Sequence, residues 1–207
     1  ELLYTATLYE DLYIKQDLYK KATEVAPGCV RAHNNLGWSY FGKEQYDAAE
    51  SAFMAAKEIK DLDIVNNNLA AVALVKGDTE KAEELFTASL GAGKEVNHNL
   101  GIVNIIKGDY DEAISYFGSE PSYNAGLAIF LSDKSETAMR TIAGLECECA
   151  TKYYMMAVIA ADQDKPEVAV ENLKLAVGKD EALKERAKKD LEFAKLFNDA
   201  AFQAVVE

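Results

Sequence analysis

The chain has 207 residues, of which 49% are hydrophobic, and its formal net charge is −13 at pH 7. A field of that sign repels phosphate backbones, so we expect no binding to nucleic acid. No stretch approaches the roughly 20 apolar residues of a membrane-spanning helix, so we expect no membrane span in this chain. The first residue is Glu1 rather than a methionine, and we expect a fragment or a processed form.

The first 29 residues end like a repeat unit whose beginning is degenerate. Leu12, Tyr19 and Ala22 keep helical spacing ahead of Pro27. We expect residues 1–29 to form a degenerate N-terminal repeat or cap.

From residue 30 onward, a small residue recurs at intervals of 33, 31, 25 and 31 residues. An alanine follows each small residue twelve positions later, and a large apolar residue stands four positions beyond that alanine. A period near 30 is typical of arrays of helix pairs, and we expect the small residue and the alanine to mark a close helix crossing. The sets are, in chain order, Gly37, Ala49 and Phe53; Ala70, Ala82 and Phe86; Gly101, Ala113 and Phe117; Gly126, Ala138 and Ile142; and Ala157, Ala169 and Leu173.

The turns inside the units carry helix stop and start signals. Lys76-Gly77-Asp78 and Lys107-Gly108-Asp109 place a glycine where the first helix ends and an aspartate that can cap the next one. Three Asp and Glu pairs have the spacing of capping boxes: Asp109 with Glu112, Asp133 with Glu136, and Asp164 with Glu167.

The fourth unit departs from the regular period, because only 25 residues separate Gly101 from Gly126. We therefore expect the second helix of the third unit to end at Gly118 and Pro121 to open the next helix. After residue 178 we expect a long amphipathic helix at 180–197 and a short apolar helix at 198–206. Terminal units of arrays are usually atypical because they cap an exposed core edge, so we interpret residues 179–207 as capping helices.

These residues resemble the tetratricopeptide repeat family over about residues 14–178. The fourth and fifth units depart from the family pattern, because Ala125 and Met156 replace its leucine and neither unit keeps its Gly-Asp-Tyr turn. The matching residues are Leu36-Gly37, Tyr40, Tyr46, Ala49, Phe53 and Ala56 in one unit, Leu100-Gly101, Gly108-Asp109-Tyr110, Ala113 and Phe117 in another, and Tyr19, Ala22 and Pro27 in the N-terminal remnant.

With this resemblance, the expected fold is all-α, a right-handed superhelical array of antiparallel helix pairs. We expect five pairs at residues 30–178 between the two atypical ends. A closer resemblance, to tetratricopeptide segments of bacterial cell-envelope lipoproteins, is carried by the runs Asn66-Asn67-Asn68-Leu69-Ala70 with Lys76-Gly77-Asp78, and Asp190-Leu191-Glu192-Phe193-Ala194-Lys195. It implies a bacterial periplasmic or cell-envelope location, with a lipid anchor ahead of residue 1; the alternative is the cytoplasm.

The resemblance also implies a concave groove, lined by the first helix of each unit, that binds peptides. The residues just after the small ones and one turn later are apolar, so we expect no clamp of cations for a C-terminal carboxylate. An inner row of asparagines matches the family pattern and is expected to bond between neighbouring helices: Asn35, Asn68, Asn99 and Asn124. An outer row is expected to face the groove: Asn34, Asn67, His98, Tyr123 and Tyr154.

We therefore expect a scaffold for protein–protein interaction that takes a protein or peptide ligand, a helix included, in an apolar groove. The expected contact residues are Asn34, Trp38, Phe41, Asn67, His98, Tyr123, Phe130 and Tyr154. The alternative is a structural spacer or dimerisation module of a larger envelope protein, a homodimer included, whose groove is filled internally.

A catalytic role is disfavoured by the sequence. His33 and His98 are the two histidines, they lie in different repeats, and we expect each to be a packing or groove residue. Cys29, Cys147 and Cys149 lack the spacing of redox or zinc pairs and are expected to be small apolar fillers at turns. With no metal spacing, phosphate loop or nucleophile elbow, we expect neither an enzyme nor a cofactor.

Overall fold

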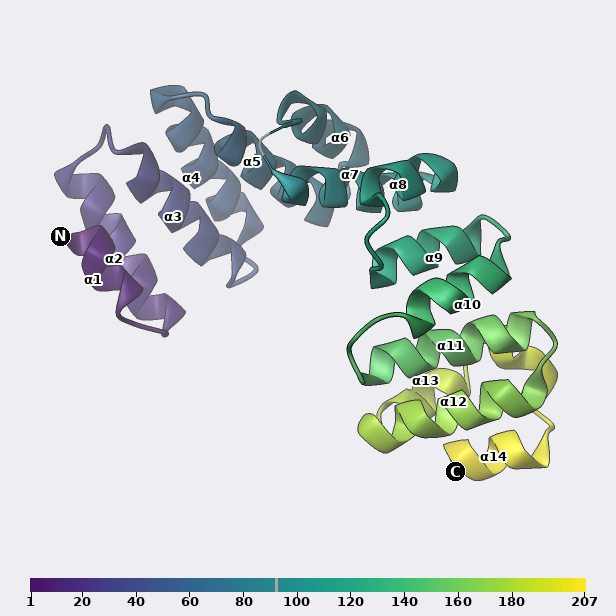
Figure 1. Ribbon diagram of the computed structural model, residues 1–207. Coiled ribbons are helices and arrows are strands. Elements are labelled where there is room, and N and C mark those ends of the chain that lie inside the picture. The colour runs from purple at the N-terminus through teal and green to yellow at the C-terminus, as the bar shows by residue number, and fades with distance from the viewer. Residues whose placement is uncertain (92) are drawn as a thin grey trace. The chain divides into compact units, whose positions relative to one another are not determined.

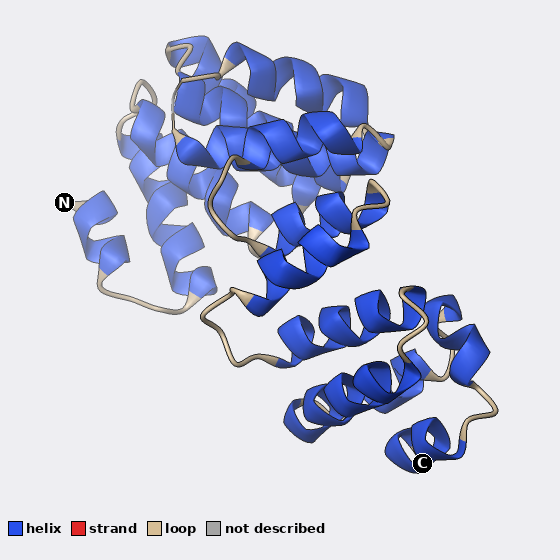
Figure 2. Cartoon of the chain, turned by 45° about the vertical axis from the view of Figure 1, so that its right-hand side comes forward, coloured by secondary structure: helices blue, strands red, loops and turns tan. Residues whose placement is uncertain are grey.

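The expected all-α class is confirmed by the computed structural model, which describes residues 1–91 and 93–207. Within these residues every regular element is a helix, and no strand occurs (Figure 2). The chain divides into two compact units, Glu1–Lys107 and Gly108–Glu207. The division falls between the two helices of the expected third pair. The expected boundaries after residues 29 and 178 stay predictions.

The first unit contains two of the expected helix pairs, α3 with α4 and α5 with α6, whose members pack against each other (Figure 1). Ahead of them α1 packs on α2, and α2 packs on α3. The helices of this unit are α1 (Leu2–Thr7), α2 (Leu12–Val25), α3 (Val30–Phe41), α4 (Tyr46–Ile59), α5 (Asp63–Val75), α6 (Thr79–Ala88) and α7 (Lys94–Lys107).

The second unit contains the other two complete pairs, α9 with α10 and α11 with α12. Short helical segments follow them and pack on α11 and α12. The elements of this unit are α8 (Tyr110–Phe117), α9 (Tyr123–Leu131), α10 (Ser135–Ala143), α11 (Ala150–Asp162), α12 (Pro166–Lys179), α13 (Leu183–Ala187), the 3₁₀ helix η1 (Leu191–Leu196) and α14 (Ala200–Val206).

The small residue of the first helix lies against the large apolar residue of the second helix. A β-carbon added to Gly37 would stand 2.5 Å from the ring of Phe53, and one added to Gly126 would collide with Ile142. Both large side chains are fully buried. The recurring spacing in the sequence therefore records a close contact inside each of these pairs, as expected.

The turn inside each unit passes through a left-handed backbone conformation. It occurs seven positions after every small residue: Glu44 (φ 59°), Gly77 (82°), Gly108 (85°), Asp133 (60°) and Asp164 (54°). Glycine adopts this conformation without strain, and aspartate tolerates it better than most residues. The turn geometry is thus kept in the fourth and fifth units, although the Gly-Asp-Tyr sequence is lost.

Two of the expected capping boxes are wrong for this reason. Asp133 and Asp164 occupy the left-handed turn, and the N-cap positions of α10 and α12 fall to Lys134 and Lys165. The expected cap at Asp78 is confirmed, because its Oδ1 accepts a hydrogen bond from the Lys81 amide at 3.1 Å.

The short second helix of the third unit is confirmed. Helix α8 ends at Phe117, and Gly118 follows with φ 71°. The next helix begins two residues later than expected from Pro121, because Ser122 is its N-cap and accepts a hydrogen bond from the Ala125 amide at 3.1 Å.

The long helix expected at 180–197 is wrong. The chain forms α13, breaks at residues 188–190 and continues as η1. Asp190 starts the second segment by accepting a hydrogen bond from the Glu192 amide at 3.2 Å, and Asp199 caps α14 in the same way. An aspartate that bonds to the backbone two residues ahead competes with helix propagation, which explains the break.

The loop before α11 departs from the expectation for cysteines. A disulfide joins Cys147 to Cys149, whose Cα atoms are 5.3 Å apart, whereas Cys29 is a free thiol. The first two are therefore not simple apolar fillers.

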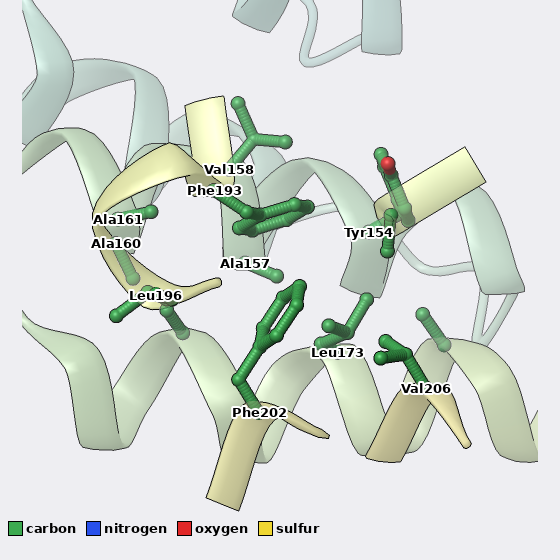
Figure 3. Close-up of a cluster of buried hydrophobic side chains, with 13 residues drawn as sticks. Tyr154, Ala157, Val158, Ala160, Ala161, Leu173, Phe193, Leu196, Phe202 and Val206 are labelled. Atoms are coloured by element: carbon green, nitrogen blue, oxygen red, sulfur yellow. The ribbon is translucent and has the colours of Figure 1, made fainter. Parts of the chain in front are cut away.

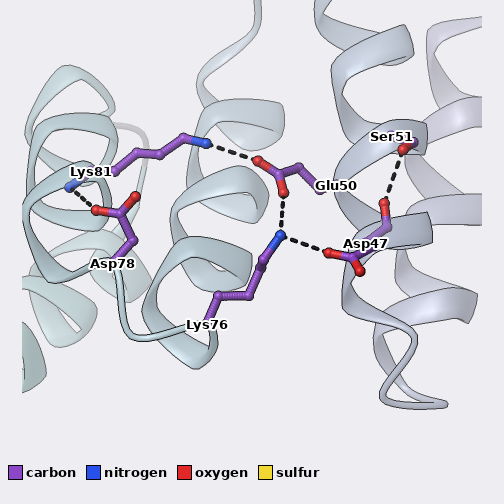
Figure 4. Close-up of polar contacts among 6 residues, drawn as sticks. All are labelled: Asp47, Glu50, Ser51, Lys76, Asp78 and Lys81. Carbon is purple, nitrogen blue, oxygen red and sulfur yellow. Dashed lines mark hydrogen bonds and ion pairs between the residues drawn. The ribbon is translucent and has the colours of Figure 1, made fainter.

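Ion pairs connect neighbouring helix pairs along one side of the first unit (Figure 4). Lys76 of the second pair lies 2.7 Å from Asp47 and 2.8 Å from Glu50 of the first pair, and Lys81 also reaches Glu50 at 2.8 Å. The two lysines hold the pKa of the Glu50 carboxyl below its ordinary value, with the hydrogen bond from Lys76 as the largest cause.

Candidate functional site

Asparagine side chains connect the first helices of successive repeats within the first compact unit. The Asn68 Nδ2 atom donates to Asn34 Oδ1 at 2.7 Å, and Asn99 Nδ2 donates to Asn67 Oδ1 at 3.3 Å. The expectation that the inner asparagines bond between helices is confirmed for Asn68 and Asn99. Their acceptors are the outer residues Asn34 and Asn67, so the two rows form one hydrogen-bonded structure.

Trp38 lies one turn after Asn34 on α3, and its side chain is 44% exposed. Its ring makes edge contacts with Phe41, at 5.3 Å between centroids, and with Phe53, at 6.1 Å. The core therefore fixes the indole while much of it stays open to solvent. A large aromatic side chain held in this way is a typical anchor for a binding partner.

A pocket of about 510 Å³ opens beside Trp38. Its walls come from α3, from the start of α5 with the residue before it, and from the segment that leads into α7. Of the expected contact residues, the pocket brings together Trp38 and Asn67. The residues that line it are Trp38, Leu62, Asp63, Ile64, Asn67, Asn68, Gly93, Glu95 and Val96.

The lining is mainly apolar but also carries two acidic residues, Asp63 and Glu95. Asp63 and Glu95 stand in the first turns of α5 and α7, where the positive end of the helix dipole stabilises a carboxylate. Both residues are exposed. No lysine or arginine is among the described residues that line the pocket.

Two amide groups of the lining are only partly hydrogen-bonded among the described residues. Asn67 uses its oxygen to accept from Asn99, and no hydrogen bond of its Nδ2 is seen in residues 1–91 and 93–207. Asn68 is 1% exposed, and its Oδ1 accepts no hydrogen bond in the same residues. Buried polar atoms are nearly always paired in folded proteins. The lining therefore keeps the N–H donors of Asn67 unused, and the unpaired Asn68 Oδ1 atom lies beneath its surface.

The other expected contact residues of the first unit lie outside this pocket. Phe41 is half-buried, packs against the core formed by α4 and α5, and makes an edge contact with Tyr46 at 5.5 Å between centroids. His98 is an exposed residue of α7. Phe41 thus supports Trp38 from behind rather than lining the pocket.

In the second unit, the C-terminal segment covers the residue that corresponds to the outer row. Tyr154 of α11 is 3% exposed (Figure 3). Its hydroxyl donates to Asp190 at 2.8 Å, its ring meets Phe193 edge-on at 5.7 Å, and the Arg186 guanidinium lies 4.6 Å from the ring centroid. Burial, followed by the hydrogen bond to Asp190, raises the pKa of the phenol. Tyr154 is therefore a core residue in this structure.

The same C-terminal segment completes the core of the second unit. Phe193 and Phe202 are fully buried, with centroids 5.6 Å apart, and they fill the space beside α11 and α12 (Figure 3). Phe130 is partly buried against this cluster, and Tyr123 is partly buried against a neighbouring one. Both side chains contribute to packing.

Sequence reasoning missed the pocket residues Leu62, Asp63, Ile64, Glu95 and Val96. A usable signal existed, because Ile64 and Glu95 both stand six positions before the small residue of their unit. That offset is about one helical turn ahead of the outer row, so both residues share its face. Ile64 is 55% exposed, which is unusual for a large apolar side chain at a pocket.

Neither a metal centre nor a membrane span is visible in the described residues. In residues 1–91 and 93–207, no three or more His, Cys, Asp or Glu side chains are grouped so that they could hold a metal ion. The same residues contain no helix with the length and apolar character needed to cross a membrane.

Two segments of the chain are similar to a known repeat family. The profile of the tetratricopeptide repeat family matches residues 30–61 and 94–118. These two segments are similar to tetratricopeptide repeats. No curated protein sequence matches the chain.

Solved tetratricopeptide-repeat structures share its fold. A chain in the crystal structure of the APC/C hetero-tetramer Cut9–Hcn1 matches with a TM-score of 0.79 and 16% identity, over 100% of this chain and 42% of that one. The C-terminal part of a TPR repeat-containing protein from Cytophaga hutchinsonii gives 0.67 at 16% identity, over 99% and 92%. YrrB, described as a TPR protein with an unusual peptide-binding site, gives 0.60 at 20% identity, over 83% and 98%. At these identities the likeness establishes the stacked helix-pair fold alone.

Proposed function

We propose that this chain is a scaffold for protein–protein interaction and that the pocket beside Trp38 holds a peptide segment of a partner protein. The observation that carries the proposal is the exposed Trp38 ring, which the core fixes at the wall of a pocket of about 510 Å³. Repeats of this family imply a protein partner. YrrB, which has the same fold, is described as having a peptide-binding site, and this agrees with the proposal.

The lining suits a peptide better than a rigid surface. Its apolar walls, Trp38, Ile64 and Val96, can take one or two side chains, and the pocket lies within the usual range of ligand sites, about 300–1,000 Å³. Asn67 has an unused donor that can bond to a peptide carbonyl. A few polar groups among apolar walls fix the direction and register of a bound chain.

A catalytic role finds no support in the site. The scaffold fold is typically non-catalytic, and the pocket holds neither a histidine nor a cysteine among its described lining residues. His33 lies outside it, with Nε2 2.9 Å from the Pro27 carbonyl oxygen. The histidines therefore remain packing or surface residues in our account.

The experiment compares two exposed isoleucines of the first unit. Ile64 lines the pocket and is 55% exposed, whereas Ile106 of α7 is 57% exposed and lies outside the lining. The full chain is incubated with an array of random ten-residue peptides, and the affinity of selected peptides is measured by titration calorimetry. We expect Ile64→Ser to weaken binding about tenfold, because the change removes apolar contact area, and Ile106→Ser to leave it unchanged. Equal effects of the two changes would contradict the proposal.

A second candidate function, a structural spacer or dimerisation module with an internally filled groove, is favoured by the covered Tyr154 in the second unit. We propose it for that unit alone. If the tail serves only to fill the surface of α11, then Phe193→Ala should expose apolar surface and make the chain self-associate. Light scattering on the full-length variant tests this, and a monomer with an unchanged elution volume would speak against it.

We also propose a cell-envelope location for the protein. The support is the resemblance of the asparagine run at 66–68 and of the tail at 190–195 to lipoprotein segments. Fractionation of cells that express the natural gene tests it, and a protein found in the cytoplasmic fraction would refute it.

A further inference from the structure

We propose that the pocket beside Trp38 selects a partner segment in which an aromatic or aliphatic residue stands next to a lysine or arginine. This inference rests on the proposed function and adds the chemistry of the ligand. It follows from the charges of the pocket, from its unused polar groups and from the way the chain covers its own second unit.

The pocket carboxylates have no cation from the chain. Neither Asp63 nor Glu95 forms an ion pair in the described residues, and no lysine or arginine lines the pocket. Two other acidic residues of the same unit differ, because Asp47 and Glu50 are paired with Lys76 at 2.7 and 2.8 Å (Figure 4). Asp47 and Glu50 are thus neutralised within the unit, whereas Asp63 and Glu95 keep their charge at the pocket.

The exposed indole gives a cation a second favourable contact. Trp38 is 44% exposed, and an ammonium or guanidinium group over an indole face is attracted by its quadrupole. The chain already uses such contacts, because Lys43 Nζ lies 3.7 Å from the Tyr13 ring centroid. A cation that enters the pocket thus meets a lining that contains both the indole and two carboxylates.

The balance of hydrogen-bond acceptors and donors around the pocket points to the same ligand, and Asn68 belongs to that set. The side chain lines the pocket, is 1% exposed and has an Oδ1 atom without a partner among the described residues. A carboxylate accepts hydrogen bonds and donates none, so the acceptors of the lining outnumber the two N–H donors of the Asn67 amide group. A ligand rich in N–H donors, such as a lysine or arginine side chain with its peptide N–H groups, complements this set.

In the second unit, the chain itself places a cation and an aromatic ring against one residue of the outer row. Tyr154 stands three positions before the small residue of its unit, as Asn34 and Asn67 do in theirs. The tail covers it with a cation and an aromatic ring, Arg186 at 4.6 Å and Phe193 at 5.7 Å between centroids. The tail of the second unit therefore brings together, from positions seven residues apart, the two kinds of group that we infer for the partner of the first unit.

The net charge of −13 acts in the same direction at long range, because it raises the rate at which a cationic segment meets the chain. Contacts of exposed charges are individually weak and are screened by salt. We therefore expect the carboxylates to determine which peptides are selected and how binding depends on salt, while Trp38 and Ile64 contribute most of the affinity.

The test uses the full chain and random ten-residue peptides, with the residues enriched among binders as the readout. We expect enrichment of Lys or Arg beside an aromatic or aliphatic residue. The double variant Asp63→Asn, Glu95→Gln should lose that enrichment, and the affinity for a selected peptide should fall about tenfold at low salt. The matched control is the double variant Glu80→Gln, Glu84→Gln, which removes the same charge from exposed positions of α6. It should keep both the enrichment of basic residues and the affinity for the selected peptide.

The possible outcomes distinguish failure of this inference from failure of the proposed function. Binders without basic residues, whose affinity still falls in Ile64→Ser, would overturn this inference and leave the proposed function standing. Basic enrichment that both double variants lose equally would show attraction by net charge alone and would overturn the inference. If no peptide binds, or if binding ignores Ile64→Ser, the proposed function fails and this inference fails with it.

Discussion

The two compact units differ in what lies on the face that carries the outer row. In the first unit, Trp38 and Asn67 line an open pocket. In the second unit, the tail buries Tyr154 to 3% exposure and adds Phe193 and Phe202 to the core. The same repeat register therefore gives a candidate binding site where no described residue of the unit covers it, and a packing surface where the chain itself does.

The largest expected effect concerns the covered face. Phe193→Ala should lower the free energy of unfolding of the second unit by about 3–5 kcal/mol, because the fully buried ring would leave a cavity. Denaturant unfolding followed by circular dichroism measures it. Leu191 of the same 3₁₀ helix is 81% exposed, so Leu191→Ala should change little. Equal effects would mean that the tail is not part of the core.

The next effect concerns the close crossing that both units share. Gly37→Leu should destabilise the first unit by roughly 1–3 kcal/mol, because even a β-carbon there stands 2.5 Å from the Phe53 ring. Gly28 is the control, since a β-carbon added to it meets no atom within 4 Å, and Gly28→Ala should be tolerated. An unchanged melting midpoint for Gly37→Leu would contradict the packing account.

A smaller effect separates the turns of the two units. Gly77 has φ 82° and space for a side chain, so Gly77→Ala should cost about 1 kcal/mol through backbone strain alone. Asp133 occupies the same turn position in the second unit with φ 60°, and Asp133→Gly should be neutral or slightly stabilising. Thermal unfolding of both variants tests the two predictions. A lower melting midpoint for Asp133→Gly would show that contacts of the aspartate side chain contribute more to stability than the relief of backbone strain.

The smallest effect is a dependence on pH in the first unit. Lys76 and Lys81 lower the pKa of Glu50 from its ordinary 4.5, so the ionised carboxylate stabilises the folded state above about pH 4.5. This contribution is lost as pH falls through the folded-state pKa. Glu50→Gln should therefore cost about 0.5–1 kcal/mol at pH 7, and the difference from wild type should shrink below pH 4.5. A difference that grows in acid would reverse the assigned sign.

The helix pairs could be predicted from the sequence because their signal is local and repeated. Gly37 with Phe53 and Gly126 with Ile142 touch inside one pair, so a fixed spacing carries the information. The left-handed turn was only half predictable, because aspartate replaces glycine in the fourth and fifth units and imitates a helix cap.

Whether the face that carries the outer row is open or covered could not be predicted in the same way. Leu183, Ala187, Leu191 and Ala194 keep helical spacing, and the break at residues 188–190 depends on the hydrogen bond that Asp190 forms with the backbone. The cover over Tyr154 depends on where that broken segment folds back. The pocket likewise depends on contacts between helices more than 20 residues apart, such as those that bring Ile64 and Val96 beside Trp38.

The most direct test of the open first face uses the single tryptophan of the chain. Trp38 is 44% exposed, so its emission in the purified protein should be red-shifted and readily quenched by acrylamide. A selected peptide should then shift the emission to the blue and protect the ring. Blue-shifted, protected emission from the protein alone would show that the pocket is already covered, and would contradict the distinction between an open and a covered unit.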